Sequence, residues 1–366
     1  MTIKISIIIP CYNAALFISN TINAVKNQSF TNWECIIIND GSTDNSLEII
    51  EKEIFNDERF QLITQQNMGL SKTRNSGMKV AKGNYIYFLD ADDFIPNSAL
   101  TDLYSYVETN SSIDIIIGQT LNTKGQENSP VNFLHNEWPK NQILANKDDS
   151  FIKFMIENST TCVAQNRLYC KEFLDTNNLL FYNGIFHEDE LWYFETMLVA
   201  KHIICIDATT YFYNISNEFA ITKNISKKNI MDYVTILNYI FSKYYLTMPS
   251  SCLKDCIGVY ILKLKIRVLE LFSICKEEDK EIAFEYVNEN FKLSKVTRTV
   301  FTFKHKFEKK ITLYNFITSF NAKKAFFILN FYNNRNFLIK FCFKIFILVN
   351  QNKYKKVKSQ YYQLEC

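Results

Sequence analysis

The sequence predicts an α/β fold: a mostly parallel β-sheet with helices on both faces, followed by a helical C-terminal region. Three observations predict it. Over residues 1–118, short and continuously apolar runs alternate with stretches of helical periodicity, which is typical of parallel strands covered on both faces. Residues 131–222 mix strand and helix patterns. From residue 223 onward the pattern is helical.

Five strands are expected in the first 118 residues, each an apolar run bounded by polar or turn-forming residues. The predicted strands are Ile5–Pro10, Glu34–Asn39, Phe60–Thr64, Tyr85–Leu89 and Asp114–Gly118. In open parallel sheets, ligands bind beyond the carboxyl ends of the strands. Tyr12, Asp40 and Asp90 follow three of these strands, so we expect them on one rim of the sheet.

Helices are expected between the strands, with Asn13 capping the first and Asp44 capping the second. The apolar face of the first helix holds Leu16, Ile18, Ile22 and Val25, and that of the second holds Leu47, Ile50 and Ile54. Further helices are predicted at Leu70–Ala81, Ser98–Val107, Asn229–Tyr245 and Cys252–Cys275.

The length of 366 residues, 47% of them apolar, suffices for about two domains. We expect residues 1–118 and 119–222 to form two halves of the α/β domain, and residues 223–366 to form the helical region. The polar stretch Gln119–Pro130 is expected to be a loop at the first boundary.

The strongest chemical signal is the run Phe88-Leu89-Asp90-Ala91-Asp92-Asp93, an apolar strand that ends in three carboxylates. Concentrated negative charge at a strand end is unfavourable unless a cation lies there. Two carboxylates together with diphosphate oxygens suit Mg²⁺ or Mn²⁺. The run therefore predicts a divalent metal site, with an acidic loop that caps the helix after Pro96 as the alternative.

Three weaker signals lie on the same predicted rim. Tyr12 can stack on a nucleotide base, Asp40 can accept the N–H of a pyrimidine, and Arg74 can reach the rim from its helix. Each has a plain alternative: an ordinary surface tyrosine, an Asp-Gly turn and a solvated helix arginine.

The order of these motifs carries more information than any one of them. The segments are Ile7-Ile8-Ile9-Pro10-Cys11-Tyr12-Asn13, Asn39-Asp40-Gly41-Ser42-Thr43-Asp44, Asn67-Met68-Gly69-Leu70 with Arg74-Asn75-Ser76-Gly77, and Asp90-Ala91-Asp92-Asp93. Together they strongly resemble the family 2 glycosyltransferases of the Rossmann-like GT-A fold, of the bacterial polysaccharide or lipopolysaccharide type. The resemblance is close over about the first 100 residues and looser afterwards.

The resemblance implies a role for each motif residue. Those it assigns to the nucleotide sugar are Pro10, Tyr12, Asp40, Arg74, Asp90 and Ala91. The first four would line a pocket for uracil or a similar base, and Asp90 would approach the ribose or the sugar. The metal, Mn²⁺ or Mg²⁺, would be held mainly by Asp92, with Asp90 and Asp93 beside it. Residues 1–118 would then bind the nucleotide sugar, and 119–222 the acceptor.

The resemblance places the catalytic base in the segment Phe186-His187-Glu188-Asp189-Glu190-Leu191-Trp192, which opens an apolar helix. The family's Glu-Asp pair maps onto Glu188 and Asp189, with Asp189 as the base. Asp189 would take the proton of an acceptor hydroxyl as it attacks the anomeric carbon opposite the leaving diphosphate, which inverts that centre. The alternative is that these acids only complement the helix N-terminus.

Two features depart from the family pattern. Asn214 follows Tyr211-Phe212-Tyr213 where the family often has a basic residue, so a diphosphate contact from that loop is not implied. His187 and His202 are candidate metal ligands by residue type alone, and a structural role is the alternative for each.

The sequence thus predicts an inverting, metal-dependent glycosyltransferase that moves a sugar from a UDP-sugar or similar donor to a hydroxyl of a glycan or lipid-linked acceptor in cell-surface polysaccharide synthesis. A nucleotidyltransferase or a dinucleotide oxidoreductase would need a Gly-rich loop where Cys11-Tyr12-Asn13 stands. A catalytically inactive, membrane-associated nucleotide-sugar-binding or scaffold protein is the alternative from another class.

Residues 321–366 differ in composition from the rest. They hold nine Lys/Arg and one Asp/Glu, a charge of +8 against +3 for the whole chain, so residues 1–320 carry −5. Lys340 and Lys344 interrupt the longest apolar run, which makes it a poor spanning helix and favours an interfacial helix on an anionic leaflet. The alternative is a helix packed on the catalytic domain or on a second subunit, so an oligomer is possible.

Two further expectations concern location and partners. Ten cysteines without a C-x-x-C pair favour free thiols in a reducing cytosol, so we expect a cytoplasmic protein, peripheral on the inner face of the membrane. No nucleic-acid partner is expected, because residues 1–320 are acidic and no nucleic-acid-binding motif is present.

Overall fold

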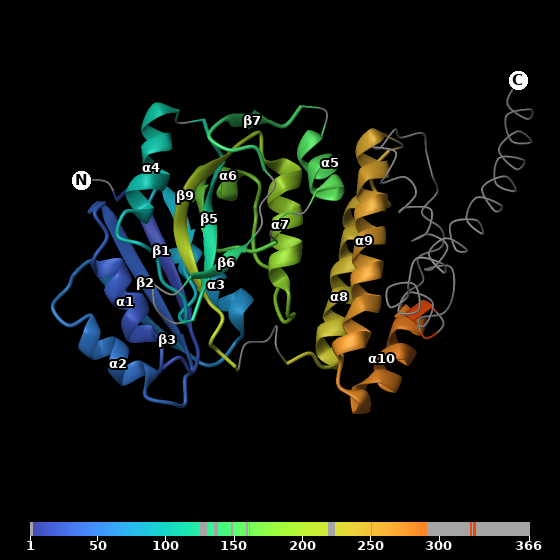
Figure 1. Cartoon of the computed structure of the whole chain (residues 1–366), viewed down its shortest axis with the longest axis horizontal. Coiled ribbons are helices and arrows are strands. Elements are labelled where there is room, and N and C mark those ends of the chain that lie inside the picture. The colour runs from blue at the N-terminus through green and yellow to red at the C-terminus, as the bar shows by residue number, and fades with distance from the viewer. Residues whose placement is uncertain are drawn as a thin grey trace, which may run out of the picture. The chain divides into compact units, whose positions relative to one another are not determined.

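The computed structural model describes residues 3–110, 112–124, 130–134, 138–147, 149–158, 160, 162–218, 224–249 and 251–290, with residues 323, 325 and 326. The chain forms two compact units, Met1–Lys223 and Asn224–Cys366, and each is described by itself. Figure 1 shows the first as a twisted sheet flanked by helices and the second as a group of helices.

The first unit is built on one mixed sheet with the strand order β3-β2-β1-β4-β8-β5-β9-β7, and β6 pairs with β5. The strands are β1 (Ile5–Cys11), β2 (Trp33–Asp40), β3 (Phe60–Gln65), β4 (Tyr85–Phe88), β5 (Ile115–Thr123), β6 (Pro130–Leu134), β7 (Ile143–Ala145), β8 (Arg167–Cys170) and β9 (His202–Asn214). The block β3-β2-β1-β4 is parallel, and β5 is parallel to β9. The predicted α/β class and the five strands predicted before residue 119 are confirmed.

The antiparallel strand β8 joins the two parallel blocks. It pairs with β4 on one side and with β5 on the other. Residues 1–118 and 119–222 therefore share one sheet, and the segment that leads into β8 lies next to the end of the parallel block.

Helices cover both faces of that block (Figure 1). The helices of the first unit are α1 (Ile18–Lys26), α2 (Ser46–Glu53), α3 (Leu70–Val80), α4 (Ala99–Thr109), α5 (Ser150–Glu157), α6 (Lys171–Thr176) and α7 (Glu188–Val199). On one face, alternate β1 residues join a fully buried core with Ile22 of α1 and Leu103 of α4. The burial of strand residues on both faces explains why these strands read as continuous apolar runs.

On the other face, α3 lies directly against β1 and β2 because Gly77 has no side chain. A Cβ at Gly77 would lie 2.5 Å from Cγ2 of Ile8 and 3.0 Å from Cδ1 of Ile38. This close approach fixes the helix relative to the strands, and therefore fixes where Arg74 and Asn75, one turn earlier, point.

The start of the first helix differs from the prediction. α1 begins at Ile18, after the N-cap Phe17, and Leu16 is 79% exposed instead of buried. Asn13 does not cap the helix: it has a φ of 50°, and its Oδ1 accepts the Thr43 N–H at 2.8 Å. The apolar spacing failed here because a contact between two loops distant in sequence fixes Asn13, and local periodicity does not register such a contact.

The start of α2 lies close to the prediction. Asp44 stands just before the N-cap Asn45, and its Oδ1 accepts the Ser46 N–H at 3.0 Å. Ile50 is fully buried, as expected for the inward face of this helix.

The predicted loop at Gln119–Pro130 is wrong in its first part, because β5 continues to Thr123. The polar side chains are accommodated by the sheet itself: Gln119 is 7% exposed, and its Nε2 donates to the Ile206 carbonyl at 2.8 Å. Pairing with β6 and β9 satisfies the backbone along this stretch. A polar run therefore forms a strand where tertiary partners supply the hydrogen bonds.

Over residues 224–290, apart from 250, the second unit is helical, as predicted. Its helices are α8 (Lys227–Ile240), the π-helical turn η2 (Phe241–Tyr245), α9 (Cys252–Ile274) and α10 (Glu277–Asn290). Ser226 and Asn229 form a capping box at the start of α8. Phe272 of α9 stacks on Phe284 of α10 with ring centroids 4.0 Å apart.

Among the described residues, no helix has the length and apolar content needed to cross a bilayer. The predicted tail, residues 321–366, lies outside the described residues except at positions 323, 325 and 326.

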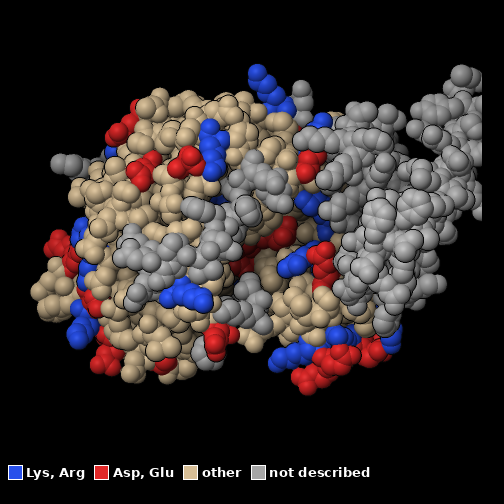
Figure 2. Space-filling view, in the orientation of Figure 1, with Lys and Arg blue, Asp and Glu red and all other residues tan. Residues whose placement is uncertain are grey.

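Charged side chains of both signs are interspersed on the face drawn in Figure 2. Interspersed charge gives a weak long-range field.

Candidate active site

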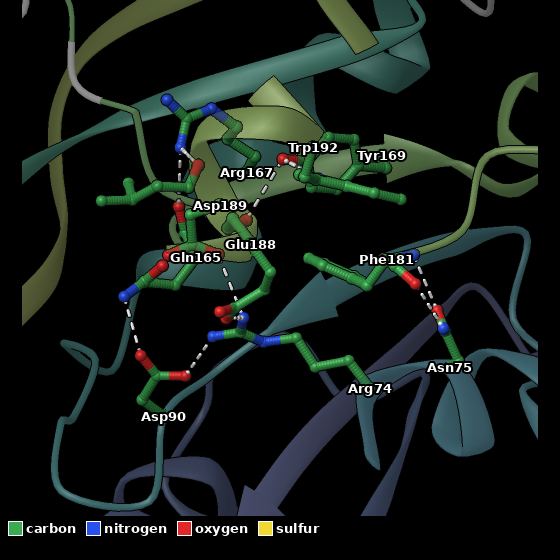
Figure 3. Close-up of polar contacts among 12 residues, drawn as sticks. Arg74, Asn75, Asp90, Gln165, Arg167, Tyr169, Phe181, Glu188, Asp189 and Trp192 are labelled. Carbon is green, nitrogen blue, oxygen red and sulfur yellow. Dashed lines mark hydrogen bonds and ion pairs between the residues drawn. The ribbon is translucent and has the colours of Figure 1, made fainter. Parts of the chain in front are cut away.

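Four charged residues from three parts of the first unit converge beside the end of β4 (Figure 3). Arg74 donates from Nη1 to Oε1 of Glu188 at 2.6 Å and to Oδ1 of Asp189 at 3.0 Å. Its Nη2 donates to Oδ1 of Asp90 at 2.9 Å. The side chains of Arg74 and Glu188 are 1% and 6% exposed, whereas those of Asp90 and Asp189 are each 22% exposed. A ligand can therefore reach the two aspartates but not the guanidinium.

Glu188 and Asp189 open α7, whose first turn is acidic. The unpaired backbone N–H groups of a helix N-terminus favour negative charge, which accounts for acids at this position. His187 is the N-cap and has a left-handed φ of 59°. The helix end explains why carboxylates are tolerated here, and the ion pairs to Arg74 explain where they point.

Asn75, next to Arg74 on α3, holds the chain that leads to α7. Its Nδ2 donates to the Phe181 carbonyl at 2.8 Å, and its Oδ1 accepts the Phe181 N–H at 2.9 Å. The Phe181 ring stacks on Trp192 with centroids 4.1 Å apart, and Trp192 Nε1 donates to the Tyr169 hydroxyl at 3.0 Å. These contacts, visible in Figure 3, form a buried wall behind the charged cluster.

Gln165, which no sequence pattern marks, holds the other side of Asp90. Its Nε2 donates to Oδ2 of Asp90 at 2.7 Å, and Gln165 is only 7% exposed. The backbone N–H of Ala164, one residue earlier, helps to lower the pKa of Asp189. A glutamine shortly before a strand looks like an ordinary loop residue, and only the pairing of β8 with β4 brings it to the site.

Asp92 and Asp93 lie close by but in different surroundings. Asp93 is 1% exposed, and its two oxygens accept hydrogen bonds from the Tyr211 hydroxyl at 2.6 Å and the Asn214 N–H at 2.8 Å. Asp92 is half-buried and accepts Asn217 Nδ2 at 2.7 Å on Oδ2. Asp93 thus ties the end of β4 to β9, while Asp92 is the more accessible of the two.

The segment Tyr211–Asn214, which lacks the family's basic residue, therefore has a structural contact here through Tyr211 and Asn214. His187 serves as the N-cap of α7, and His202 begins β9 with its backbone N–H bonded to Asp114 at 2.9 Å.

Residues predicted to bind the nucleotide sugar lie at or just after the ends of the parallel strands β1, β2 and β4. Tyr12, after β1, is 51% exposed, whereas Pro10 and Ala91 are buried. Asp40, at the end of β2, is 3% exposed. Its oxygens accept Gln65 Nε2 at 2.7 Å and the backbone N–H groups of Met68 and Gly69, each at 2.9 Å.

Asp40 therefore orders the loop before α3 in this structure. Tyr12 is the most exposed side chain of this set. Contacts of these residues with a nucleotide base stay a prediction.

Burial and mutual repulsion shift the pKa values of the acids. Burial and the charge of Asp189 raise the pKa of Glu188 to about 7, although Arg74 lowers it in part. Burial also raises the pKa of Asp189, against the opposing effect of Arg74. Burial alone would lower the Arg74 pKa, but the charges of Asp189, Asp90 and Glu188 outweigh it and raise that pKa. The guanidinium thus stays charged, while burial makes Glu188 and Asp189 easier to protonate than exposed carboxylates.

The chemistry of the donor set fits a metal that takes most of its ligands from a substrate. No cluster of three or more His, Cys, Asp or Glu suited to a metal occurs in the described part of the chain. Burial and the charge of Asp90 raise the pKa of Asp92, which means that the ionised Asp92 carboxylate is destabilised. A divalent cation beside Asp92 would stabilise that ionised form. Mg²⁺ and Mn²⁺ sites with one or two carboxylates plus phosphate oxygens match this situation.

The family model for glycosyl transferase family 2 matches residues 6–177. The chain is 30% identical over 271 residues to the uncharacterized glycosyltransferase EpsJ of Bacillus subtilis, covering 72% of this chain and 76% of EpsJ. It is 29% identical over 249 residues to the poly(ribitol-phosphate) β-N-acetylglucosaminyltransferase TarP of Staphylococcus aureus, covering 66% and 72%. The chain belongs to glycosyltransferase family 2, which confirms the resemblance seen in its motifs.

Two solved glycosyltransferase structures have a fold similar to that of this chain. TarS residues 1–349 of S. aureus, in complex with UDP-GlcNAc, matches with a TM-score of 0.64 at 18% identity over 88% of each chain. The mannosyltransferase PcManGT of Pyrobaculum calidifontis, in complex with GDP-Man and Mn²⁺, matches with a TM-score of 0.51 at 11% identity, over 91% of this chain and 88% of that one. The predicted GT-A fold is confirmed.

Proposed function

We propose that this glycosyltransferase is inverting and metal-dependent. It transfers a sugar from a nucleotide-diphosphate sugar, with UDP as the favoured nucleotide, to a hydroxyl of a glycan or lipid-linked acceptor in cell-surface polysaccharide synthesis. The observation that carries the proposal is the convergence of Asp189 and Asp90 on Arg74, which sets a carboxylate of α7 beside the donor edge of the sheet.

Asp189 is the proposed base because it combines access with orientation. Its side chain is 22% exposed against 6% for Glu188, and its Oδ1 is held by Arg74. A base needs a fixed position within hydrogen-bond reach of the acceptor hydroxyl. Asp189 takes the hydroxyl proton as the oxygen attacks the anomeric carbon, and attack opposite the leaving diphosphate inverts that carbon.

Asp92 is the proposed principal protein ligand of the metal, with Asp90 beside it. When bound, Mn²⁺ or Mg²⁺ supplies charge stabilisation to the leaving diphosphate. The hydrogen bonds on both oxygens of Asp93 support a positioning role for that residue instead. Tyr12, exposed after β1, is the proposed stacking surface for the nucleotide base.

The similar proteins support the choice of donor and acceptor class. TarS is solved with UDP-GlcNAc, and TarP is named for transfer of N-acetylglucosamine to poly(ribitol phosphate). A UDP-sugar donor and a polymer acceptor are therefore the first pair to test. PcManGT, solved with GDP-Man and Mn²⁺, supports including GDP-mannose and manganese in the same test.

The test is a thermal-shift screen of nucleotide sugars with and without Mn²⁺, followed by an assay of released nucleotide diphosphate. A bound ligand raises the apparent melting temperature by mass action. We expect stabilisation by UDP-sugars that needs the metal, together with slow donor hydrolysis. Binding without any hydrolysis or transfer would instead support the inactive binding or scaffold protein.

A further inference from the structure

One buried guanidinium holds carboxylates from two distant parts of the chain. Arg74 bonds Asp90, 16 residues away, and Glu188 and Asp189, 114 and 115 residues away. Its Nη1 faces the two acids of α7 and its Nη2 faces the acid after β4, so the planar fork sets the spacing between the two sides (Figure 3).

This cluster is not built for stability. Three carboxylates are ion-paired to the one guanidinium of Arg74, and a buried excess of like charge is unfavourable. Two buried polar atoms within it, Nε of Arg74 and Oε1 of Gln165, have no hydrogen-bond partner. Buried networks that are only partly satisfied cost free energy, and they occur where function requires them.

Arg74 is also out of reach of a ligand. Its side chain is 1% exposed, and each terminal nitrogen is already bonded to a carboxylate. The part of the cluster open to substrates is the pair of aspartates that Arg74 holds, each 22% exposed.

We propose that Arg74 is a positioning residue that sets the direction of Asp189 relative to Asp90, and that it acts on the rate of the chemical step without reading the nucleotide base. This role rests on the proposed function, in which Asp189 is the base. The guanidinium fork fixes where the Asp189 carboxylate stands relative to the anomeric carbon of a donor held by the strand ends.

Gln165 makes the proposal specific. Asp90 is bonded by Arg74 on Oδ1 and by Gln165 on Oδ2, whereas Asp189 has its ion pair with Arg74 and the charge of Arg167 nearby. If Arg74 is changed, Asp90 keeps its amide partner, but Asp189 loses its ion pair. The donor side is then disturbed less than the base side.

The experiment measures donor binding and donor turnover separately in the full-length protein. Arg74→Lys keeps the charge but has no planar fork. The double variant Arg74→Gln with Glu188→Gln removes the guanidinium together with one of the acids it pairs with, which limits the excess of negative charge that is left. The probes are UDP with Mn²⁺ in calorimetry and UDP-N-acetylglucosamine in a hydrolysis assay, in which water replaces the unidentified acceptor.

We expect kcat for hydrolysis to fall about 100-fold in both variants, the size of effect produced by a misplaced reacting group. The Kd for UDP and the KM for the donor should stay near the wild-type values. Arg59→Lys is the matched control: Arg59 pairs with Asp57 in another loop and is 39% exposed, so its variant should behave as the wild type. Circular dichroism and melting curves show whether each variant is folded.

Two results would overturn the assignment of Arg74. One is a Kd for UDP that weakens tenfold or more, about 1.4 kcal/mol, with kcat unchanged, which would make Arg74 a nucleotide-binding residue. The other is a folded double variant with wild-type kcat. Failure of the proposed function looks different, because the wild type itself would then neither bind UDP with Mn²⁺ nor hydrolyse the donor.

Discussion

Asp189 and Glu188 are neighbours in sequence with different surroundings in the fold. Both accept a hydrogen bond from Nη1 of Arg74, but the Glu188 side chain is 6% exposed and that of Asp189 is 22% exposed. The inner acid holds the guanidinium, and the outer acid is the more accessible of the two. This difference assigns separate roles to two residues of the same chemical type.

Asp189→Asn should abolish transfer while leaving the fold intact. The amide cannot take a proton at neutral pH, so kcat should fall by about 100-fold or more. The melting temperature should hold or rise, because one of three carboxylates that share a single cation is neutralised. Wild-type turnover in this variant, measured as nucleotide diphosphate released, would rule out Asp189 as the base.

Asp92→Ala should remove the metal-dependent part of donor binding. The substitution deletes the half-buried carboxylate proposed to hold the ion, so Mn²⁺ should no longer strengthen binding of UDP. Calorimetric titration with and without Mn²⁺ measures this effect. Asp102→Ala, on the first turn of α4 and away from the site, provides the control. An unchanged titration in Asp92→Ala would place the metal elsewhere.

Glu188 should make stability depend on pH. Its pKa is about 7 in the fold against an ordinary value of 4.5, so between these values the folded state binds more protons than the unfolded state. Stability from this group is present at low pH and is lost as the pH rises towards about 7. Glu188→Gln lacks this dependence, so in urea unfolding it should gain stability relative to the wild type between about pH 5 and about pH 8. Parallel pH curves for the two proteins would contradict the raised pKa.

At the scale of elements, helix α3 links the sheet to the charged cluster. Arg74 and Asn75 point towards α7 and its preceding loop, and Gly77 packs on Ile8 and Ile38. Any displacement of α3 from the sheet therefore moves both side chains that hold Asp189, the proposed base, and the loop before α7.

Gly77→Ala should thus reduce activity and stability together. The added Cβ would lie 2.5 Å from Ile8 Cγ2, so α3 must shift outward at a cost of about 1–3 kcal/mol. Lys79→Ala, on the exposed side of the same helix, is the control and should be near neutral. Urea unfolding and donor hydrolysis measure the two effects. Full activity with normal stability would show that the close packing of α3 is dispensable.

At the scale of the whole molecule, the basic and aromatic-rich composition of residues 321–366 predicts contact with a membrane surface. The peripheral membrane location remains a prediction from composition. Deleting 321–366 should move the protein from the membrane fraction to the supernatant in cell fractionation, because an interfacial helix and its basic residues would be removed. Unchanged fractionation, or a change only in oligomeric state, would instead support packing against protein.

Much of the fold follows from local pattern. The buried runs of β1, β2 and β4 are continuous in sequence because both faces of the sheet are covered. Where the pattern failed, a distant partner decided the outcome: Asn13 is fixed by Thr43, and Gln119 by Ile206. Periodicity contains no information about hydrogen bonds between segments far apart in sequence.

The sequence by itself determined the α/β class, the strand ends that carry Tyr12, Asp40 and Asp90, and membership of family 2, because these depend on residue order within short segments. Tertiary structure alone decided that Arg74 faces Asp90, Glu188 and Asp189, and that Gln165 completes the cluster. These contacts join residues up to 115 positions apart through the packing of α3, α7 and β8 around one sheet. The spacing of residues within a short segment cannot predict these contacts, because they form only when the helices pack on the sheet.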